Sequence, residues 1–465
     1  MIGTASMKRL KRRNTPNSER FAPSPYSLQK AAKGADIYSW FSIIIFGFGN
    51  LARRQFTKGV IFLVTEIAVI YFLATTGVEY LPKITTLGTL KATKIKIRGF
   101  WHYTEGDSSV EILLYCVMSL AAICLLIFLA TLSLRSAYKA QDTVAKGKKP
   151  ANFYEDLKSL LDQNAHVGFM TIPTIGIVLF TILPLIFMIS MAFTNYDSKH
   201  VPLFSWVGLQ NFFDIGNSNS LINAKVFIDV LVWTLVWAFF ATFLNFFFGM
   251  FMAMIINRRT TRFKGLWRTC FSLTVAVPQF VSLLVMHSML QREGAINRLL
   301  LASGWIHSPL PFFQDATWAR VTVILINLWV GIPYTIMQIT GILQNVPAEL
   351  YEAAELDGAS WWQRFMNVTM PYIFFVMTPY LITTFTGNVN NFNVIYLLSG
   401  GDPSSLTSSA GKTDLLITWL YKLTVDKSDY SMGAVIGIMT FIVLAVVALI
   451  TYRNSGSYKN EEGFR

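Results

Sequence analysis

The sequence has little charge, few cysteines and few histidines. Only 14% of its 465 residues are charged, against about 25% in an average soluble domain. The three cysteines include no CxxC pair, and the five histidines are scattered without the spacing of a metal motif. These shortages exclude a disulfide framework and a zinc ribbon. They leave redox or metal chemistry without a candidate site.

A cleavable signal peptide is not expected either, because the first 36 residues contain no apolar stretch and no A-x-A site. What the chain does have is apolar residues, at 53% of the total, with 37 phenylalanines in long runs. A water-exposed surface does not tolerate such runs. The 39 Lys and Arg residues exceed the 26 acids, but they flank the apolar runs and form no aromatic-interleaved patch. Nucleic-acid binding is thereby excluded.

Eight segments are long enough to cross a bilayer, which takes about 20 mostly apolar residues. We therefore expect an all-α polytopic membrane protein with about eight transmembrane helices. A shorter apolar stretch at 37–51 is interpreted as an interfacial or re-entrant helix, with a short span as the alternative. The eight expected spans are 58–77, 110–132, 168–193, 226–256, 270–291, 317–342, 371–397 and 432–452.

The basic residues indicate the orientation of these spans. With eight spans both termini lie on one side, and the stretches on that side hold about 26 of the 39 Lys and Arg residues. The positive-inside rule then places both termini on the cytoplasmic side of a bacterial cell membrane. The loop 78–109 is an exception, because it carries five basic residues although this orientation places it on the outer side.

The loop 343–370 has a helical pattern of its own. Pro347 suits the first position of a helix, and acids at 349, 352 and 355 lie along one side of it. Asp357-Gly358 predicts a turn, and the S-x-x-Q pattern from Ser360 predicts a capping box that starts a second short helix. The pattern alone leaves two interpretations open, a solvated acidic hairpin or a cytoplasmic docking element.

The spacing within this loop resembles the EAA signature of the permeases of ABC importers, which reads E-A-A, three residues, G, nine residues and I-x-L-P. Here Val368 and Met370 replace the usual Ile and Leu, a volume-tolerant change. The resemblance implies that the loop, 347–366, is a coupling helix that seats on an ATPase. The matching positions are Glu352, Ala353, Ala354, Gly358 and Pro371.

Longer stretches resemble the MalF-type permease subunit of maltose and maltodextrin importers, which belongs to the binding-protein-dependent transport inner-membrane component family. They include GILQNVPAELYEAAELDGA, VGLQNF at 207–212 and GFGNLARRQFTKGVIFL at 47–63, so the resemblance covers roughly 40–455. It implies a type I ABC-importer permease core at 168–455, after a basic cytoplasmic region (1–57) and two accessory spans with a linker (58–167). A cytoplasmic tail (456–465) follows. The folded domain that some MalF proteins carry between the third and fourth spans has no counterpart.

This family also implies the partners and the energy source. They are a second, MalG-like permease subunit, an ABC ATPase dimer, a lipid-anchored extracellular sugar-binding protein, and membrane lipid. Gly411-Lys412-Thr413 ends like a P-loop, but Leu406 stands where the first glycine is required. We therefore expect no cofactor in this chain, with ATP and Mg on the partner ATPase, and a transport subunit rather than an enzyme.

Two polar stripes cross the expected spans. Asn327, Gly331 and Tyr334 share one face of 317–342, and Thr384, Asn388 and Asn391 repeat that spacing in 371–397. Asn both donates and accepts hydrogen bonds, as a sugar hydroxyl does. From the spacing alone, helix–helix packing remains the alternative.

The MalF resemblance implies that these stripes bind sugar. The positions that match maltose contacts are Asn327, Val330, Gly331, Tyr334, Thr384, Gly387 and Asn388. Gly387 replaces an aromatic residue that stacks on the sugar, which leaves room for a longer or different cargo. Arg320, at the outer end of its span, is interpreted as an interface anchor rather than a substrate ligand. The Phe-rich run 239–251 is interpreted as lipid-facing or core packing.

An autonomous, ion-coupled sugar transporter is the alternative function. Such a protein would need acidic or histidine side chains within its spans. The core spans offer only His287, which stands alone, and Asp229 and Glu293, which lie near span ends. A membrane-embedded enzyme is a third class, but no convergent acid, base and nucleophile set is visible.

Overall fold

The computed structural model describes residues 26–97, 100–104, 106–162, 165–216, 222–258, 260–405 and 407–454. The basic segment before residue 26, Arg259, Leu406 and the expected tail 456–465 lie outside these residues. The chain forms two compact units, Met1–Phe187 and Met188–Arg465, and each is described by itself.

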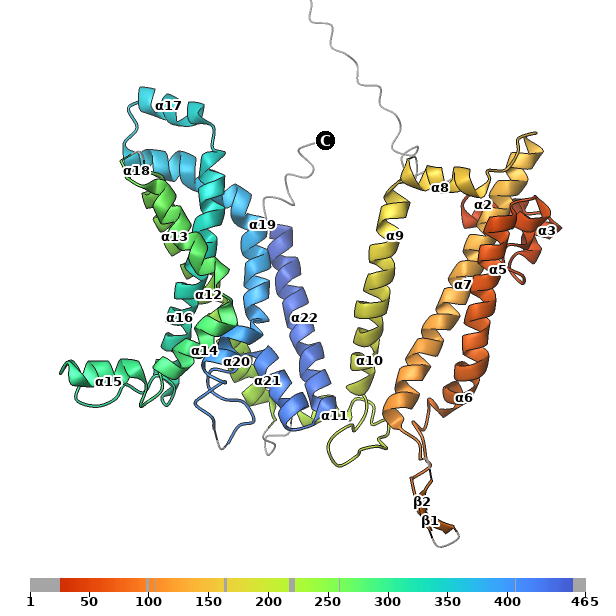
Figure 1. Cartoon of the computed structure of the whole chain (residues 1–465), viewed down its shortest axis with the longest axis horizontal. Coiled ribbons are helices and arrows are strands. Elements are labelled where there is room, and N and C mark those ends of the chain that lie inside the picture. The colour runs from red at the N-terminus through yellow and green to blue at the C-terminus, as the bar shows by residue number, and fades with distance from the viewer. Residues whose placement is uncertain are drawn as a thin grey trace, which may run out of the picture. The chain divides into compact units, whose positions relative to one another are not determined.

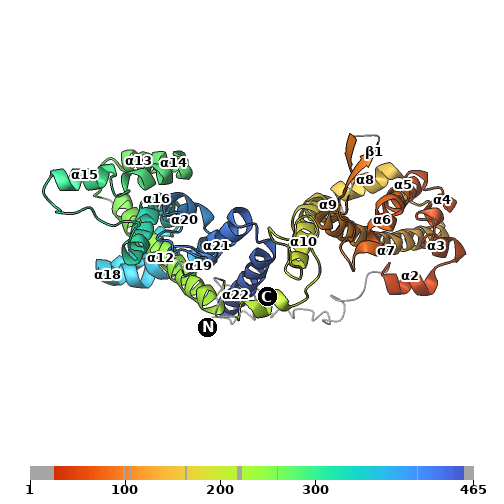
Figure 2. The ribbon, with the colours of Figure 1, turned by 90° about the horizontal axis from the view of Figure 1, so that it is seen from below.

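The first unit is built on two long helices. Helix α5 (Phe56–Phe72) continues through a π-helical turn, η1 (Leu73–Gly77), α6 (Val78–Tyr80) and a 3-10 turn, η2 (Leu81–Lys83). It packs beside α7 (Ser109–Ala145), as Figures 1 and 2 show. Short helix α2 (Leu28–Gly34) also packs on α7. Both long helices are apolar enough to cross a membrane.

The stretch expected as an interfacial or re-entrant helix forms two five-residue helices, α3 (Ile37–Phe41) and α4 (Phe48–Ala52), joined by turns. It is not among the helices long enough to span a membrane. The buried Glu66 carboxylate on α5 accepts a hydrogen bond from the Phe46 N–H at 2.8 Å. Ser133 Oγ on α7 accepts one from the Gly47 N–H at 2.8 Å. These contacts hold the turn against both long helices and satisfy buried backbone groups.

An antiparallel hairpin interrupts this unit, formed by β1 (Lys94–Ile97) and β2 (Phe100–Tyr103). At its base the Asp107 carboxylate accepts hydrogen bonds from the N–H groups of Thr89 and Leu90, both at 3.0 Å, and from Lys83 Nζ at 2.9 Å. Beyond α7 lie α8 (Phe153–Leu161), α9 (Ala165–Ile177), a π-helical turn η3 (Val178–Ile182) and α10 (Leu183–Met191).

Three long helices form the centre of the second unit: α12 (Ala224–Asn257), α16 (Ala316–Gln344) and α19 (Met370–Val389). They lie side by side in both views (Figures 1 and 2). Buried apolar side chains such as Phe246, Ile336 and Ile373, one from each helix, pack together between them. The remaining elements are α11 (Gln210–Asp214), α13 (Lys264–Ala276), α14 (Gln279–Met289), α15 (Ala295–Ala302), α17 (Ala348–Leu356), α18 (Trp361–Arg364), η4 (Phe365–Thr369), α20 (Phe392–Leu398), α21 (Leu416–Tyr421), η5 (Lys422–Asp426) and α22 (Tyr430–Asn454).

The described residues contain seven helices long and apolar enough to cross a membrane, and the number is eight if the bent pair of α13 and α14 is counted as one span. The all-α fold class is confirmed, with the short β1–β2 hairpin as the only pair of strands in the described residues. The expected span 270–291 is not one straight helix, because α13 and α14 meet at 83°. Pro278, the N-cap of α14, lies at this bend, where a proline cannot continue the hydrogen-bonding pattern of the preceding helix.

The expected span 371–397 was placed too far along the chain. The helix runs continuously from Trp361 to Val389 and ends at Asn390. Asn391 then caps the separate helix α20 by accepting a hydrogen bond from the Val394 N–H. The run of asparagines is therefore a helix boundary. The polar loop 398–431 also contains the helix α21.

Candidate functional site

A polar cavity of about 190 Å³ lies between α12, α16 and α19, far larger than the roughly 30 Å³ that one water occupies in the liquid. All three helices belong to the second unit, and each contributes polar side chains to the lining. The lining includes Thr242, Asn245, Gln279, Asn327, Gly331, Tyr334, Thr384, Asn388 and Asn391. The two stripes that the sequence predicts are therefore brought together around one space.

The stripe on α16 forms one wall. Asn327 is buried, with only 5% of its surface exposed, whereas Tyr334 is 47% exposed. Gly331 between them lets α12 approach closely, since a Cβ there would stand 2.5 Å from Asn245 Nδ2. The wall thus combines a buried amide, a bare stretch of backbone and an accessible phenol.

The stripe on α19 is joined to α12 by hydrogen bonds. Asn388 Nδ2 donates to Thr242 Oγ1 at 2.9 Å, and Asn388 Oδ1 accepts from Asn391 Nδ2 at 3.3 Å. The backbone carbonyl of Asn388 also accepts from Trp237 Nε1 at 3.1 Å. These bonds fix the position of the Asn388 amide at the cavity wall.

Two buried groups in this wall have no hydrogen-bond partner within the described chain. They are Asn327 Nδ2, a donor, and Asn245 Oδ1, an acceptor. The other half of the Asn245 amide donates to the Ala241 carbonyl at 2.7 Å. An unsatisfied buried polar group costs about 1–3 kcal/mol. A ligand that both donates and accepts hydrogen bonds would satisfy the two together.

Two predicted residues do not line this cavity. Val330 packs against the buried apolar cluster around Trp233 and Val323. Gly387 faces open space, because no atom lies within 4 Å of the position that a Cβ would occupy there. The sequence-based prediction missed Thr242 and Asn245, which lie inside the Phe-rich run 239–251. An amide within a membrane span was the available signal.

That Phe-rich run serves two purposes. Phe246 is buried at 1% exposure and packs in the core, whereas Phe239 and Phe251 are about half exposed. The lipid-facing and the core-packing parts of the interpretation therefore describe different faces of α12. Thr242 and Asn245 add a third, polar face.

A helical hairpin connects the two cavity helices α16 and α19. It consists of α17, a turn and α18, and it stands at one end of the central helices (Figure 1). Gly358 adopts a φ of +71°, which a residue with a side chain rarely does. Ser360 and Gln363 form the predicted capping box. Pro347 is the N-cap of α17 rather than its first residue, and Pro371 lies in the first turn of α19.

The predicted coupling residues lie on the outside of this hairpin. Glu352 and Ala353 are exposed, and Ala354 is half-buried. Glu352 lines a pocket of about 610 Å³ together with Arg258, Tyr351 and Trp361. The guanidinium of Arg258 lies 5.3 Å from the ring centroid of Trp361, and Arg364 pairs with Glu355. The hairpin is thus a braced unit with an acidic, open face.

Within the described residues, no group of three His, Cys, Asp or Glu side chains is close enough together to hold a metal ion. A bundle of helices able to cross a membrane, with a polar cavity inside it and a hairpin linking two of the cavity helices, is the architecture of a membrane transport protein.

The comparisons with known proteins identify the class further. The model of the family described as binding-protein-dependent transport system inner membrane component matches residues 245–456. The galactooligosaccharides transport system permease protein GanP of Bacillus subtilis is 35% identical over 429 residues, covering 90% of this chain and 97% of GanP. The maltodextrin transport system permease protein MalC of Streptococcus pneumoniae is 33% identical over 432 residues, covering 90% and 96%. The chain belongs to this family of ABC-importer permeases, and it is therefore a transport component rather than an enzyme.

Two further comparisons bear on parts of the chain. The maltose/maltodextrin transport system permease protein MalF of Escherichia coli is 32% identical over 235 residues, which are 49% of this chain and 45% of MalF. A crystal structure of a bacterial ABC transporter that imports the acidic polysaccharide alginate matches with a TM-score of 0.52 and 22% identity. It covers 64% of this chain and 98% of that chain. This structural similarity supports the helical fold described above.

Proposed function

We propose that this chain forms half of the transmembrane pathway of an ATP-driven carbohydrate importer, and that its cargo is maltose or a maltodextrin. The observation that carries the proposal is that Asn327 Nδ2 and Asn245 Oδ1, both without a hydrogen-bond partner among the described residues, belong to one membrane cavity. A sugar hydroxyl donates and accepts at once, so it matches both groups. The Tyr334 ring supplies an apolar surface for the sugar ring.

The relatives support a carbohydrate cargo and favour two kinds of oligosaccharide. Maltodextrin permeases match over nearly the whole chain at 31–33% identity. GanP, a galactooligosaccharide permease, matches at 35%, which makes galactooligosaccharide the second candidate. Uptake of labelled maltotriose and of labelled galactotriose by cells that carry the complete transporter would separate them. Uptake of galactotriose alone would overturn the maltodextrin assignment.

The proposed partners follow from the family and from the hairpin. They are a MalG-like second permease subunit, an ABC ATPase dimer that binds ATP and Mg, and an extracellular lipid-anchored sugar-binding protein. The exposed face of α17 suits the ATPase, with Glu352 as the polar contact and Gly358 as the turn. This proposal requires the hairpin to lie in the cytoplasm, on the side that the basic residues predict for both termini.

The connectivity offers a way to couple hydrolysis to access. The hairpin leads directly from α16, which carries Asn327, to α19, which carries Asn388. A rigid movement of the hairpin would shift both cavity walls. Transport with a hydrolysis-deficient ATPase tests this proposal against an ion-coupled transporter. Uptake that persists without ATP hydrolysis would support the ion-coupled alternative and overturn the importer.

A further inference from the structure

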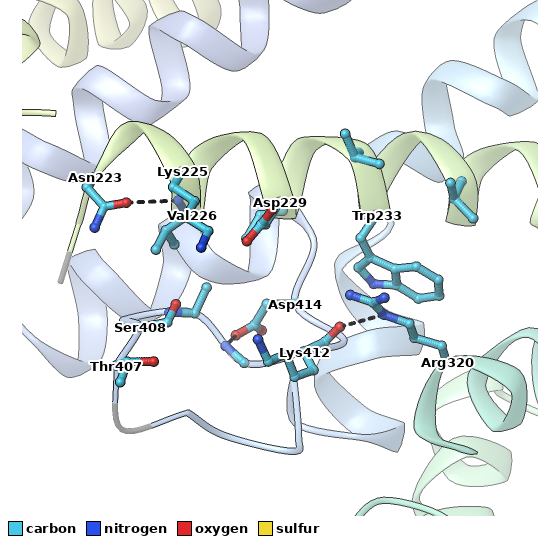
Figure 3. A pocket seen from close by; sticks show the side chains of 15 residues that line it. Asn223, Lys225, Val226, Asp229, Trp233, Arg320, Thr407, Ser408, Lys412 and Asp414 are labelled. Carbon is cyan, nitrogen blue, oxygen red and sulfur yellow. Dashed lines mark hydrogen bonds between the residues drawn. The ribbon is translucent and has the colours of Figure 1, made fainter. Parts of the chain in front are cut away.

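A pocket of about 730 Å³ lies at the opposite end of α12 from the α17 hairpin. We call it the Arg320 pocket. The first turns of α12, Arg320 at the start of α16 and the segment 407–414 line it. Figure 3 shows these side chains facing one another across it. Because Lys225, Asp229 and Arg320 lie in the first turns of α12 and α16, the pocket stands at the level where these spans enter the membrane interface.

The pocket has an excess of positive charge. Lys225, Arg320 and Lys412 line it, and none of them forms a salt bridge within the described chain. Of the two acids, Asp414 is fully buried and pairs with Lys422 at 2.8 Å. Asp229 is exposed and forms no salt bridge within the described residues. Three cations therefore face one carboxylate, which favours an anionic ligand that also carries a hydrogen-bond donor.

Arg320 is held in place for such a ligand. Its Nε donates to the Lys412 carbonyl at 3.1 Å, and its guanidinium lies 4.7 Å from the ring centroid of Trp233. Both contacts are visible in Figure 3. The two Nη groups have no hydrogen-bond partner within the described residues. A guanidinium that is fixed on one edge and free on the other suits a phosphate group.

An apolar track begins directly at this pocket. Val232, Val236 and Phe239 follow Asp229 along one face of α12. All three are exposed, by 54%, 38% and 51%. Asn245, in the polar cavity, lies on the opposite face of the helix from Val236. The Arg320 pocket is therefore separate from the proposed sugar site.

We propose that the Arg320 pocket binds the headgroup of an anionic glycerophospholipid. The phosphate lies against Arg320, Lys225 and Lys412, a hydroxyl of the headgroup donates to Asp229, and the acyl chains follow the exposed apolar track. Cations at the interface level above an apolar surface are the arrangement that anionic lipid headgroups recognise. Phosphatidylglycerol, with one phosphate charge and free hydroxyls, is the matching probe.

The test uses the complete transporter, purified with its partner subunits and reconstituted in phosphatidylcholine nanodiscs with a minor share of labelled phosphatidylglycerol. Lys225→Gln with Lys412→Gln removes two cations whose side chains are exposed, so the fold is retained. We expect the preference for phosphatidylglycerol over phosphatidylcholine to fall by about tenfold or more. The matched control, Arg298→Gln with Lys427→Gln, removes the same charge from exposed positions outside the pocket and should leave the preference unchanged.

Three results would overturn the proposal. One is an equal loss of preference in the control, which would show a general charge effect. The second is displacement of the labelled lipid by maltoheptaose or by inorganic phosphate, which would show a soluble ligand. The third is cross-linking of a Val236→Cys variant to the second permease subunit in place of labelling by a lipid-phase reagent. That result would make this face of α12 a subunit interface.

Discussion

Gly331 of α16 lies directly against the side-chain amide of Asn245 on α12. A Cβ at position 331 would stand 2.5 Å from Asn245 Nδ2, closer than non-bonded atoms approach. That amide is fixed by its bond to the Ala241 carbonyl. The pair therefore sets both the spacing of the two helices and the width of the polar cavity.

We expect Gly331→Val to lower sugar uptake by roughly fivefold or more. The new side chain must displace the Asn245 amide, whose hydrogen bond contributes about 1 kcal/mol, and it narrows the cavity. Uptake of labelled oligosaccharide by the intact transporter measures this. Gly341→Val is the control, since Gly341 lies on the same helix with nothing within 4 Å of an added Cβ. Equal effects of the two variants would show that the spacing at Gly331 has no special role.

Asn388→Ala removes a hydrogen bond to Thr242 and one from Asn391, and with them a polar group at the cavity wall. We expect the KM for uptake to rise by about tenfold while the subunits still assemble. Asn345→Ala, at an exposed position at the end of α16, should leave KM unchanged. Normal uptake by Asn388→Ala would favour helix packing as the purpose of this stripe.

Gly387 has open space around it, at the position where the MalF resemblance implies an aromatic residue. We therefore expect Gly387→Tyr to fold and assemble normally. The added ring offers a stacking surface, so uptake should shift toward shorter oligosaccharides. Competition between maltose and maltoheptaose measures the shift, and an unchanged preference would exclude position 387 from the cargo-selecting surface.

Glu352→Lys reverses the charge on the exposed face of α17. We expect the ATPase to co-purify several-fold less efficiently, because a charged contact that becomes repulsive costs a binding interface one or more kcal/mol. Membrane insertion should be normal. Glu293→Lys, which makes the same charge reversal at an exposed position outside the hairpin, is the matched control. Unchanged recovery of the ATPase with Glu352→Lys would contradict the coupling role.

The base of the β1–β2 hairpin should respond to acid. The pKa of the Asp107 carboxyl group is lowered to about 2, because the Leu90 N–H, the Lys83 ammonium and the Thr89 N–H all bind its charged form. A lowered pKa means that the stabilisation is complete above the unfolded value near 4 and is lost as pH falls toward 2. Protease cleavage near the hairpin should rise over this range in the wild type.

Asp107→Asn should show the raised cleavage already at neutral pH, because the amide cannot carry the charge that these three donors bind. Its cleavage should also vary less between about pH 4 and pH 2 than that of the wild type. A pH profile identical to that of the wild type would assign the acid response to another group.

Several features of the fold could be predicted from local sequence. The long apolar runs require helices, because backbone groups in lipid have no other way to be satisfied. The turn at Gly358 and the capping box at Ser360 follow from the conformations those residues favour. The helix break between α13 and α14 was missed, although Pro278 in the middle of this apolar run was an available signal. The asparagines after Val389 were assigned to a span although they end one helix and cap the next.

The sequence alone determined that the chain is a polytopic membrane protein and that Asn327, Gly331, Thr384 and Asn388 form two polar stripes, since hydropathy and helical periodicity are local properties. Only the tertiary structure decided that the two stripes face one cavity, that Asn245 completes it and that Val330 and Gly387 lie outside it. The packing of α12, α16 and α19 sets which faces meet. That packing depends on side chains far apart in the chain, which no local pattern records.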